Sequence, residues 1–156
     1  MPDLLFCFLR KRWIKSSPEE KIRQALINYL VKGLDYPSNQ IIIEKNIDCL
    51  PHLTFHSSSR PPLRRLDLLI MAKNLHPCHP FYPLLLIECK ATTLNNKALR
   101  QVLGYNHFLK ACFVAVANHQ EIQMGWIDEQ QNFCIHQGLP PYLILLEQAK
   151  QMMSFV

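Results

Sequence analysis

The sequence predicts an α/β sandwich, in which a mixed central sheet is flanked by helices. Apolar runs of strand length, at residues 41–46, 66–71, 84–90 and 113–117, alternate with amphipathic segments of helical period. The chain has 156 residues, 49% of them hydrophobic, which is the length and apolar content of one globular domain. We therefore expect residues 17–156 to form a single domain, preceded by a basic N-terminal tail at residues 1–16.

The first helix has a well-defined start. Ser17 suits the N-cap, Pro18 suits the first helical position, and Glu20 lies three residues after Ser17, as in a capping box. Apolar residues then recur at helical spacing before Gly33, namely Ile22, Ala25, Leu26, Tyr29 and Leu30. These features predict an amphipathic helix from Pro18 to about Gly33.

Two apolar strands follow a first, isoleucine-rich strand at residues 41–46. They lie at residues 66–71 and 84–90. The segment 50–62 is rich in proline, serine and histidine and predicts a loop, and the three prolines within 73–83 predict another.

The second half of the chain predicts a helix, two strands and a closing helix. The helix covers residues 94–110, with Ala98, Val102, Tyr105 and Leu109 on one stripe. Residues 113–117 form a short buried strand, residues 124–127 an edge strand, and the last helix begins near Pro141.

Charged residues inside the two apolar strands are the strongest functional signal, because an unpaired buried ion costs several kcal/mol. The first strand contains Asp67, and the second contains Glu88 and Lys90. A hairpin closed around residues 77 and 78 places Asp67 opposite Glu88, with Cβ atoms roughly 4.5–5.5 Å apart. Two carboxylates this close favour a bridging cation, and Mg²⁺ suits carboxylate oxygens, waters and a phosphate.

Lys90 adds the second half of a hydrolytic site. An ammonium group next to a metal-activated phosphate can orient the attacking water and offset the developing negative charge. The alternative is an ordinary ion pair at the strand end, in which Asp67 contacts Lys90 or Arg65.

The arrangement of Asp67 followed by Glu88-Cys89-Lys90 resembles the PD-(D/E)XK nuclease signature. More specifically, the chain resembles the N-terminal nuclease domain of type I restriction enzyme R subunits. Four ordered stretches carry the resemblance: SPEEKIRQ, RRLDLLI, LLIECKA and ALRQVLGYNHFLKACFVAVAN. The resemblance implies a restriction-endonuclease-like α/β sandwich.

It also implies roles for individual residues. Asp67 and Glu88 would be ligands of Mg²⁺, or of Mn²⁺ as a substitute, together with the backbone carbonyl of Cys89. Lys90 would be the catalytic lysine.

The first helix of such domains supplies a further glutamate near the metal, and the family pattern points to Glu19. Helical geometry agrees, because Glu19 lies near the centre of the Ile22/Leu26/Tyr29 stripe and Glu20 lies to its side. Two alternatives stay open: Glu20 is the inward carboxylate, or Glu19 only complements the helix dipole.

Gln101 and Tyr105 resemble the QxxxY motif of these nucleases and share a helix face at i, i+4. The resemblance gives Gln101 a role at the catalytic face or the DNA backbone; without it, Tyr105 is core and Gln101 is surface. Arg64 and Arg65 precede Asp67 and are candidate phosphate contacts, or else part of a solvated basic loop.

We therefore expect a Mg²⁺-dependent DNA endonuclease, a hydrolase of phosphodiester bonds. The alternatives are a catalytically silent nucleic-acid-binding or assembly module of the same fold, and an RNA-directed nuclease. The net charge of +5 permits a nucleic-acid partner without requiring one. Expected partners are DNA and a separate motor or specificity subunit. No membrane segment is expected, because the apolar N-terminal run is far shorter than about 20 residues. Without a signal peptide, a cytoplasmic protein with reduced cysteines is expected.

Overall fold

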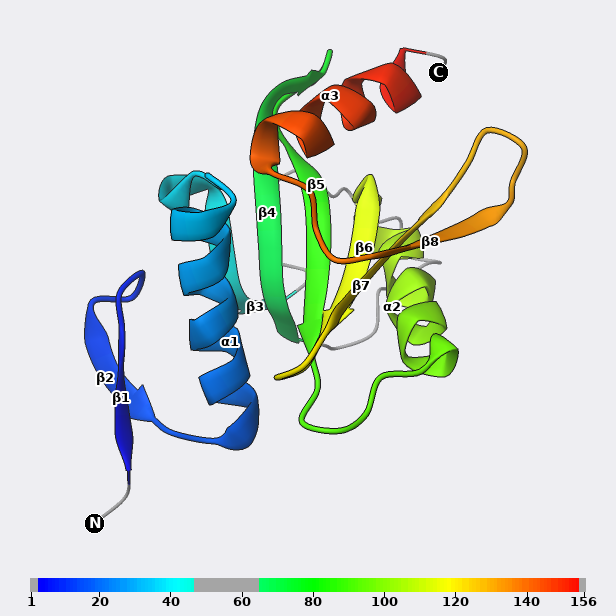
Figure 1. Cartoon of the computed structure of the whole chain (residues 1–156). Coiled ribbons are helices and arrows are strands. Elements are labelled where there is room, and N and C mark those ends of the chain that lie inside the picture. The colour runs from blue at the N-terminus through cyan, green and yellow to red at the C-terminus, as the bar shows by residue number, and fades with distance from the viewer. Residues whose placement is uncertain (1–2, 47–64, 155–156) are drawn as a thin grey trace.

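A six-stranded mixed sheet forms the centre of the molecule, which confirms the predicted α/β sandwich (Figure 1). The computed structural model describes residues 3–46 and 65–154. The strands lie side by side in chain order: β3 (Ile41–Asn46), β4 (Arg65–His76), β5 (His79–Cys89), β6 (Phe113–Ala117), β7 (Ile122–Ile127) and β8 (Phe133–Gln137). Strands β5 and β6 are parallel, and the other neighbours in this sheet are antiparallel. The parallel pair is connected by a helix, as a parallel connection requires.

The helices cover both faces of the sheet. Helices α1 (Pro18–Asn28) and α3 (Tyr142–Met153) pack on one face, in a core cluster that contains Leu85 and Ile87 of β5. Helix α2 (Asn96–Leu109) packs on the other face, in a second cluster that contains Leu86. Alternate residues of β5 therefore enter two different cores, and this explains its uninterrupted apolar run.

Helix α1 begins where the sequence predicts. The hydroxyl of Ser17 accepts a hydrogen bond from the backbone N–H of Glu20 at 3.1 Å, and Pro18 opens the helix. A π-helical turn at Tyr29–Gly33 continues it to the expected end. In a full capping box the Glu20 carboxylate would also accept a hydrogen bond from the backbone N–H of Ser17. Here it accepts hydrogen bonds from the side chains of Arg10, Arg23 and Gln24 instead.

The β4–β5 hairpin is longer than predicted. Its turn lies at Pro77 and Cys78, as the hairpin prediction required, but the loop expected over residues 73–83 is wrong because both strands continue through it. Prolines are tolerated here because Pro77 lies in the turn and Pro83 lies at a register shift, where Leu84 is an extra residue.

Two further elements differ from expectation. Residues 124–127 belong to β7, which is not an edge strand because β8 pairs outside it. Strand β8 is largely exposed and lacks an apolar run, so periodicity gave no signal for it. Instead of a tail, the N-terminal residues form an antiparallel hairpin of β1 (Leu4–Cys7) and β2 (Arg12–Lys15), in which Cys7 is fully buried.

Some expectations fall outside the described residues, namely the loop at 50–62, Cys49 and Arg64. The five cysteines within the described ranges are free thiols, as expected. In residues 3–46 and 65–154, none of the helices has the length and apolar content that crossing a membrane requires.

Candidate active site

Strands β4 and β5 separate at the end of the sheet that carries Asp67. Their pairing runs to Leu68 and Ile87 and stops there, although β4 stays paired with β3 and β5 stays paired with β6 beyond this point. The side chain of Asp67 fills the interrupted ladder, since its Oδ2 accepts a hydrogen bond from the backbone N–H of Cys89 at 2.8 Å. A buried N–H that loses its ladder partner is thereby satisfied by a carboxylate.

At Leu68 and Ile87 the hairpin has the register that the turn predicted, because the two register shifts between there and the turn, at Lys73/His76 and at Ile70/Met71, cancel. Because Leu68 pairs with Ile87, the next residues outward, Asp67 and Glu88, lie opposite each other. Glu88 is buried, with 7% of its surface exposed, as expected for a charge inside an apolar strand.

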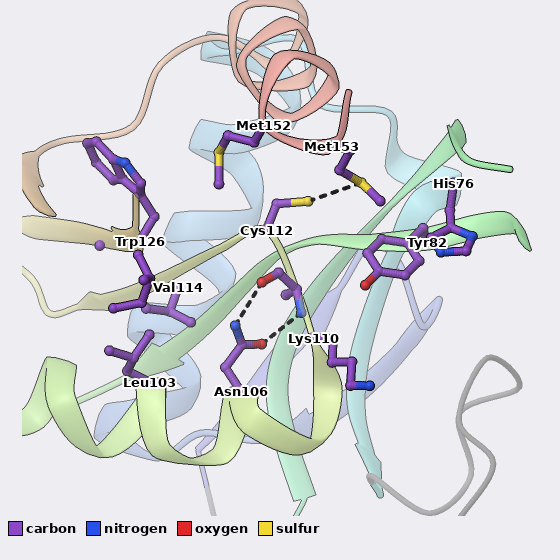
Figure 2. A pocket seen from close by; sticks show the side chains of 13 residues that line it. His76, Tyr82, Leu103, Asn106, Lys110, Cys112, Val114, Trp126, Met152 and Met153 are labelled. Carbon is purple, nitrogen blue, oxygen red and sulfur yellow. Dashed lines mark hydrogen bonds between the residues drawn. The ribbon is translucent and has the colours of Figure 1, made fainter. Parts of the chain in front are cut away.

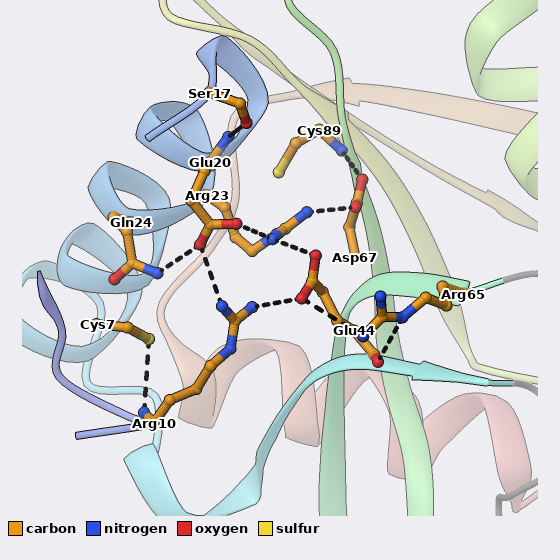
Figure 3. A network of polar contacts seen from close by, with 10 residues as sticks. All are labelled: Cys7, Arg10, Ser17, Glu20, Arg23, Gln24, Glu44, Arg65, Asp67 and Cys89. Carbon is orange, nitrogen blue, oxygen red and sulfur yellow. Dashed lines mark hydrogen bonds and ion pairs between the residues drawn. The ribbon is translucent and has the colours of Figure 1, made fainter. Parts of the chain in front are cut away.

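Arg23 of α1 lies at the centre of a polar network (Figure 3). Its Nη2 donates to Oδ1 of Asp67 at 2.8 Å, and its Nη1 donates to Oε1 of Glu44 at 3.0 Å and to the carboxylate of Glu20. The guanidinium therefore joins acidic residues from α1, β3 and β4. The ion pair of Asp67 is with Arg23 and not with Lys90 or Arg65, the alternatives considered from the sequence.

Arg10 brings a second guanidinium from the N-terminal hairpin. Its Nη2 lies 3.1 Å from Glu44, and its Nη1 lies 3.5 Å from Glu20. Three carboxylates are thus matched by two arginines, in a region where the side chains of Arg23, Glu20 and Arg10 are at most 14% exposed. Partly buried charges of this kind are tolerated because each has an opposite charge beside it.

The pKa values of Arg23 and Cys89 both lie above their ordinary values in this network. Burial lowers the pKa of Arg23, but the carboxylates of Asp67, Glu20 and Glu44 outweigh burial and leave that pKa above its ordinary value. Burial, and next the negative charge of Asp67, raises the pKa of the Cys89 thiol to about 12. Cys89 is therefore a neutral thiol at physiological pH and not a nucleophile.

The expectation that Glu19 faces inward is wrong. Glu19 is exposed, whereas Glu20 is buried with 6% of its surface accessible. The reason is that the buried face of α1 differs from the predicted one. Ala25 and Tyr29 are exposed and Ile27 is buried, so the buried face is rotated toward Glu20.

Glu44 was missed from the sequence. It lies opposite Asp67, between the paired positions Ile43↔Leu68 and Lys45↔Leu66, and has a positive φ of 49°. A left-handed conformation is uncommon for glutamate and accompanies functional or strained positions. The available signal was similar to the one that identified Asp67: Glu44 is a carboxylate in a predicted strand and directly follows the run Ile41–Ile43.

The remaining candidate residues differ in their exposure and in their distance along the chain from Asp67. Lys90 is half-buried and follows β5, with its backbone N–H bonded to Ala117. Arg65 has an exposed side chain that reaches Glu44, whereas Gln101 is exposed and lines a shallow groove on α2 with Asn96, Lys97 and Arg100. Tyr105 packs against the core under α2, as its alternative role as a core residue required.

The donor set suits a hard cation in its chemistry. Asp67 and Glu88 offer carboxylate oxygens and Cys89 a backbone carbonyl, which are ligands that Mg²⁺ prefers. Within the described ranges, however, the side chains form no group of three or more His, Cys, Asp or Glu that could hold a metal. Both oxygens of Asp67 are already engaged, by Arg23 and by Cys89. A cation at Asp67 would therefore compete with Arg23.

A separate cavity of about 340 Å³ lies at the opposite end of the hairpin (Figure 2). Tyr82, Trp126 and the thiol of Cys112 line it, with Met152 and Met153 from α3. None of the site residues expected from the sequence lines this cavity, so it gives no support to the nuclease chemistry.

The thiols predict a pH dependence of stability. Burial raises the pKa of Cys112 to about 12, as it does that of Cys89. Since an unfolded cysteine ionises near pH 8.5, the unfolded state loses these protons first, and the free energy of unfolding should fall as pH rises above about 8.5. Urea titrations across this range should show a flatter fall for the Cys89→Ala/Cys112→Ala double variant. The exposed Cys78 is the control, and equal slopes for Cys78→Ala and the double variant would contradict the assignment.

A family model described as type I restriction enzyme R protein N terminus (HSDR_N) matches residues 18–140, which is most of the chain. The match includes α1, the β4–β5 hairpin, α2 and the strands that follow. No curated protein and no solved structure matches the chain significantly. The chain therefore belongs to the family of type I restriction enzyme R protein N-terminal regions.

Proposed function

We propose that the chain is a Mg²⁺-dependent DNA endonuclease domain of the PD-(D/E)XK type. The observation that carries this proposal is the opening between β4 and β5, where Asp67 bridges to the backbone of Cys89 and Glu88 and Lys90 lie on either side of that residue. The family provides the restriction-enzyme context, and hence DNA as the substrate and further subunits as partners.

In this proposal each residue has a defined task. Asp67 and Glu88, with the carbonyl of Cys89, hold the metal ion, and Lys90 orients the attacking water and stabilises negative charge on the phosphate. A Mg²⁺ ion held by these residues would supply Lewis acidity and would make a water molecule easier to deprotonate. Glu20 takes the position beside the site that the sequence had given to Glu19, because Glu20 is the carboxylate that reaches Arg23.

The DNA backbone would be contacted by residues with exposed side chains. Arg65, at the edge of the ion-pair network, is suited to this because its side chain is 66% exposed and it lies two residues before Asp67. We include Arg64 on its sequence position alone, and Gln101, with Tyr105 beneath it, as a contact from α2.

Incubation of supercoiled plasmid with the purified protein tests the activity. Nicked or linear product is expected with Mg²⁺ or Mn²⁺ and none with EDTA. Asp67→Asn should abolish cleavage, whereas Glu129→Gln, which removes an exposed carboxylate, should not. Circular dichroism must show that both variants are folded. Cleavage that persists in folded Asp67→Asn, or in EDTA, would overturn the proposal.

The ion-pair network favours a second candidate function, a catalytically silent module that binds DNA or other subunits. Arg10 and Arg23 already form ion pairs with Glu20, Glu44 and Asp67. Calorimetric titration with Mg²⁺ and Mn²⁺ separates the two functions. Binding that is lost in Asp67→Asn supports the nuclease, and an absence of binding to the wild type supports the silent module.

A further inference from the structure

The N-terminal hairpin exposes a cluster of aromatic side chains. The ring of Phe6 lies 5.5 Å from that of Phe8 and 5.4 Å from that of Trp13, both in edge-to-face geometry. Phe8 is 73% exposed and Trp13 is 65% exposed, with Leu4 beside them at 56%. Large aromatic side chains are rarely left this accessible in a group, and such patches mark interaction sites.

The pairing of β1 with β2 explains why these residues share one face. Phe6 pairs with Trp13, and Leu4 pairs with Lys15, so these side chains project from the same side of the two-stranded sheet. Cys7 belongs to the alternate set and is fully buried. The hairpin therefore packs through one face and leaves the aromatic face open.

The charge of the hairpin is entirely positive. Residues 4–16 contain Arg10, Lys11, Arg12 and Lys15 and no acidic residue. Arg10 is engaged by Glu20 and Glu44, whereas Lys11, Arg12 and Lys15 are exposed. Lys15 shares the aromatic face, because it pairs with Leu4, and Lys11 lies in the turn. Arg12 pairs with Cys7 and projects from the other face at the turn end. This positive charge suits a polyanion better than an apolar protein surface.

The position of the hairpin adds a geometric argument. It lies beside α1, on the side away from the central sheet (Figure 1), and Arg10 connects it directly to the network that contains Asp67 (Figure 3). A strand held on the hairpin would lie beside the element that anchors Arg10 in this network.

We propose that the hairpin Leu4–Lys15 is a binding site for single-stranded nucleic acid. Trp13 and Phe8 stack on unpaired bases, Lys15 on the same face neutralises adjacent phosphates, and Lys11 and Arg12 at the turn end contact the phosphates of a strand that passes that end. Single strands are the occupant because a duplex keeps its base faces stacked on each other and offers none to an aromatic ring. The proposal extends the proposed nuclease function by assigning a strand-binding element that Arg10 connects to the network around Asp67, but the binding does not depend on cleavage.

The two tryptophans of the chain, Trp13 and Trp126, allow a direct test. In a Trp126→Phe background, the fluorescence of Trp13 is expected to be quenched by a short oligothymidylate, in EDTA so that no cleavage occurs. Anisotropy of a labelled oligonucleotide should show roughly 5- to 150-fold weaker binding for Trp13→Ala, and near-normal binding for Trp13→Phe. The control is Phe81→Ala, which removes an aromatic ring that is 44% exposed on β5.

A second variant addresses the cations. The Lys11→Ala/Arg12→Ala/Lys15→Ala triple variant should reduce the slope of log affinity against log salt by about 2, because each lost phosphate contact contributes about 0.7 for a single strand. This measurement stands even if a variant at Trp13 fails to fold.

The outcomes also separate this proposal from the nuclease. If the wild type binds the oligonucleotide through Trp13 but does not cleave DNA, the hairpin site is supported and the nuclease proposal is contradicted. Unquenched Trp13 and unchanged affinity in Trp13→Ala overturn the hairpin site, whatever the cleavage result. So does duplex binding with the same dependence on Trp13, or a Trp13-dependent self-association with no effect of the oligonucleotide.

Discussion

Replacing Lys90 by alanine is expected to lower the rate of Mg²⁺-dependent DNA cleavage by roughly 10²- to 10³-fold. In the proposed site, Lys90 supplies positive charge where the phosphate gains negative charge, and that contribution is made in the transition state. Metal binding should be unchanged, because the carboxylates of Asp67 and Glu88 remain. Single-turnover cleavage and calorimetry with Mn²⁺ measure the two properties separately.

The matched control for Lys90 is Lys150→Ala, since Lys150 is an exposed lysine on α3. It removes the same charge from the chain without touching the candidate site, so it should cleave at the wild-type rate. A Lys90→Ala variant that cleaves as fast as Lys150→Ala would remove Lys90 from the mechanism. Equal loss in both variants would indicate an effect of net charge on DNA binding.

Arg23→Met is expected to lower the free energy of unfolding by about 3 kcal/mol. Methionine keeps the buried packing of the side chain, but Glu20 and Asp67 lose the guanidinium that they share. Removing one partner from a buried ion pair is strongly destabilising because it leaves an uncompensated charge. Urea unfolding monitored by circular dichroism measures the change.

Arg65→Met provides the control, because Arg65 also approaches Glu44, at 3.7 Å, but has a side chain that is 66% exposed. Its loss should change stability by less than about 1 kcal/mol. The cost of Arg23→Met should also be smaller in an Asp67→Asn background, since one stranded charge is then absent. Equal stabilities of Arg23→Met and the wild type would show that the network does not hold the fold together.

The competition between Arg23 and a cation gives the network a bearing on function. Arg23 binds Oδ1 of Asp67, the same carboxylate that the proposed metal site requires. Arg23→Met should therefore bind Mg²⁺ no more weakly than the wild type, even though it is less stable. A lower free energy of unfolding together with undiminished Mg²⁺ binding in Arg23→Met would identify Arg23 as a counter-ion of Asp67. A residue that only supports the fold would weaken both properties when replaced.

Local pattern predicted much of the fold. The N-cap at Ser17, the strand Phe113–Ala117 and the closing helix after Pro141 all lie where the sequence indicated. The turn at residues 77 and 78 was predictable too, but the register at Asp67 and Glu88 matches the prediction only because two shifts of the ladder, at Lys73/His76 and at Ile70/Met71, cancel. The cap, the apolar strand and the turn depend on neighbouring residues, which are visible in a sequence.

Other features had no local signal. Strand β8 lacks apolar alternation, and it exists because β7 offers it a hydrogen-bonded edge. The strands around Pro80 and Pro83 persist because each proline lies at a register shift, Pro83 beside the extra residue Leu84 and Pro80 between the pairs Lys73↔Phe81 and His76↔His79. In both cases pairing with a neighbouring strand prevailed over intrinsic preference.

The sequence by itself determined that charges occur inside apolar strands and that two of these strands form a hairpin with its turn at residues 77 and 78, because both features follow from local residue types. Only the tertiary structure decided which charges meet. It turned Glu20 inward in place of Glu19, brought Glu44 from β3, and set Arg23 between them and Asp67. The physical reason is that helix rotation and the packing of α1 on the sheet depend on contacts between distant segments, which no local period encodes.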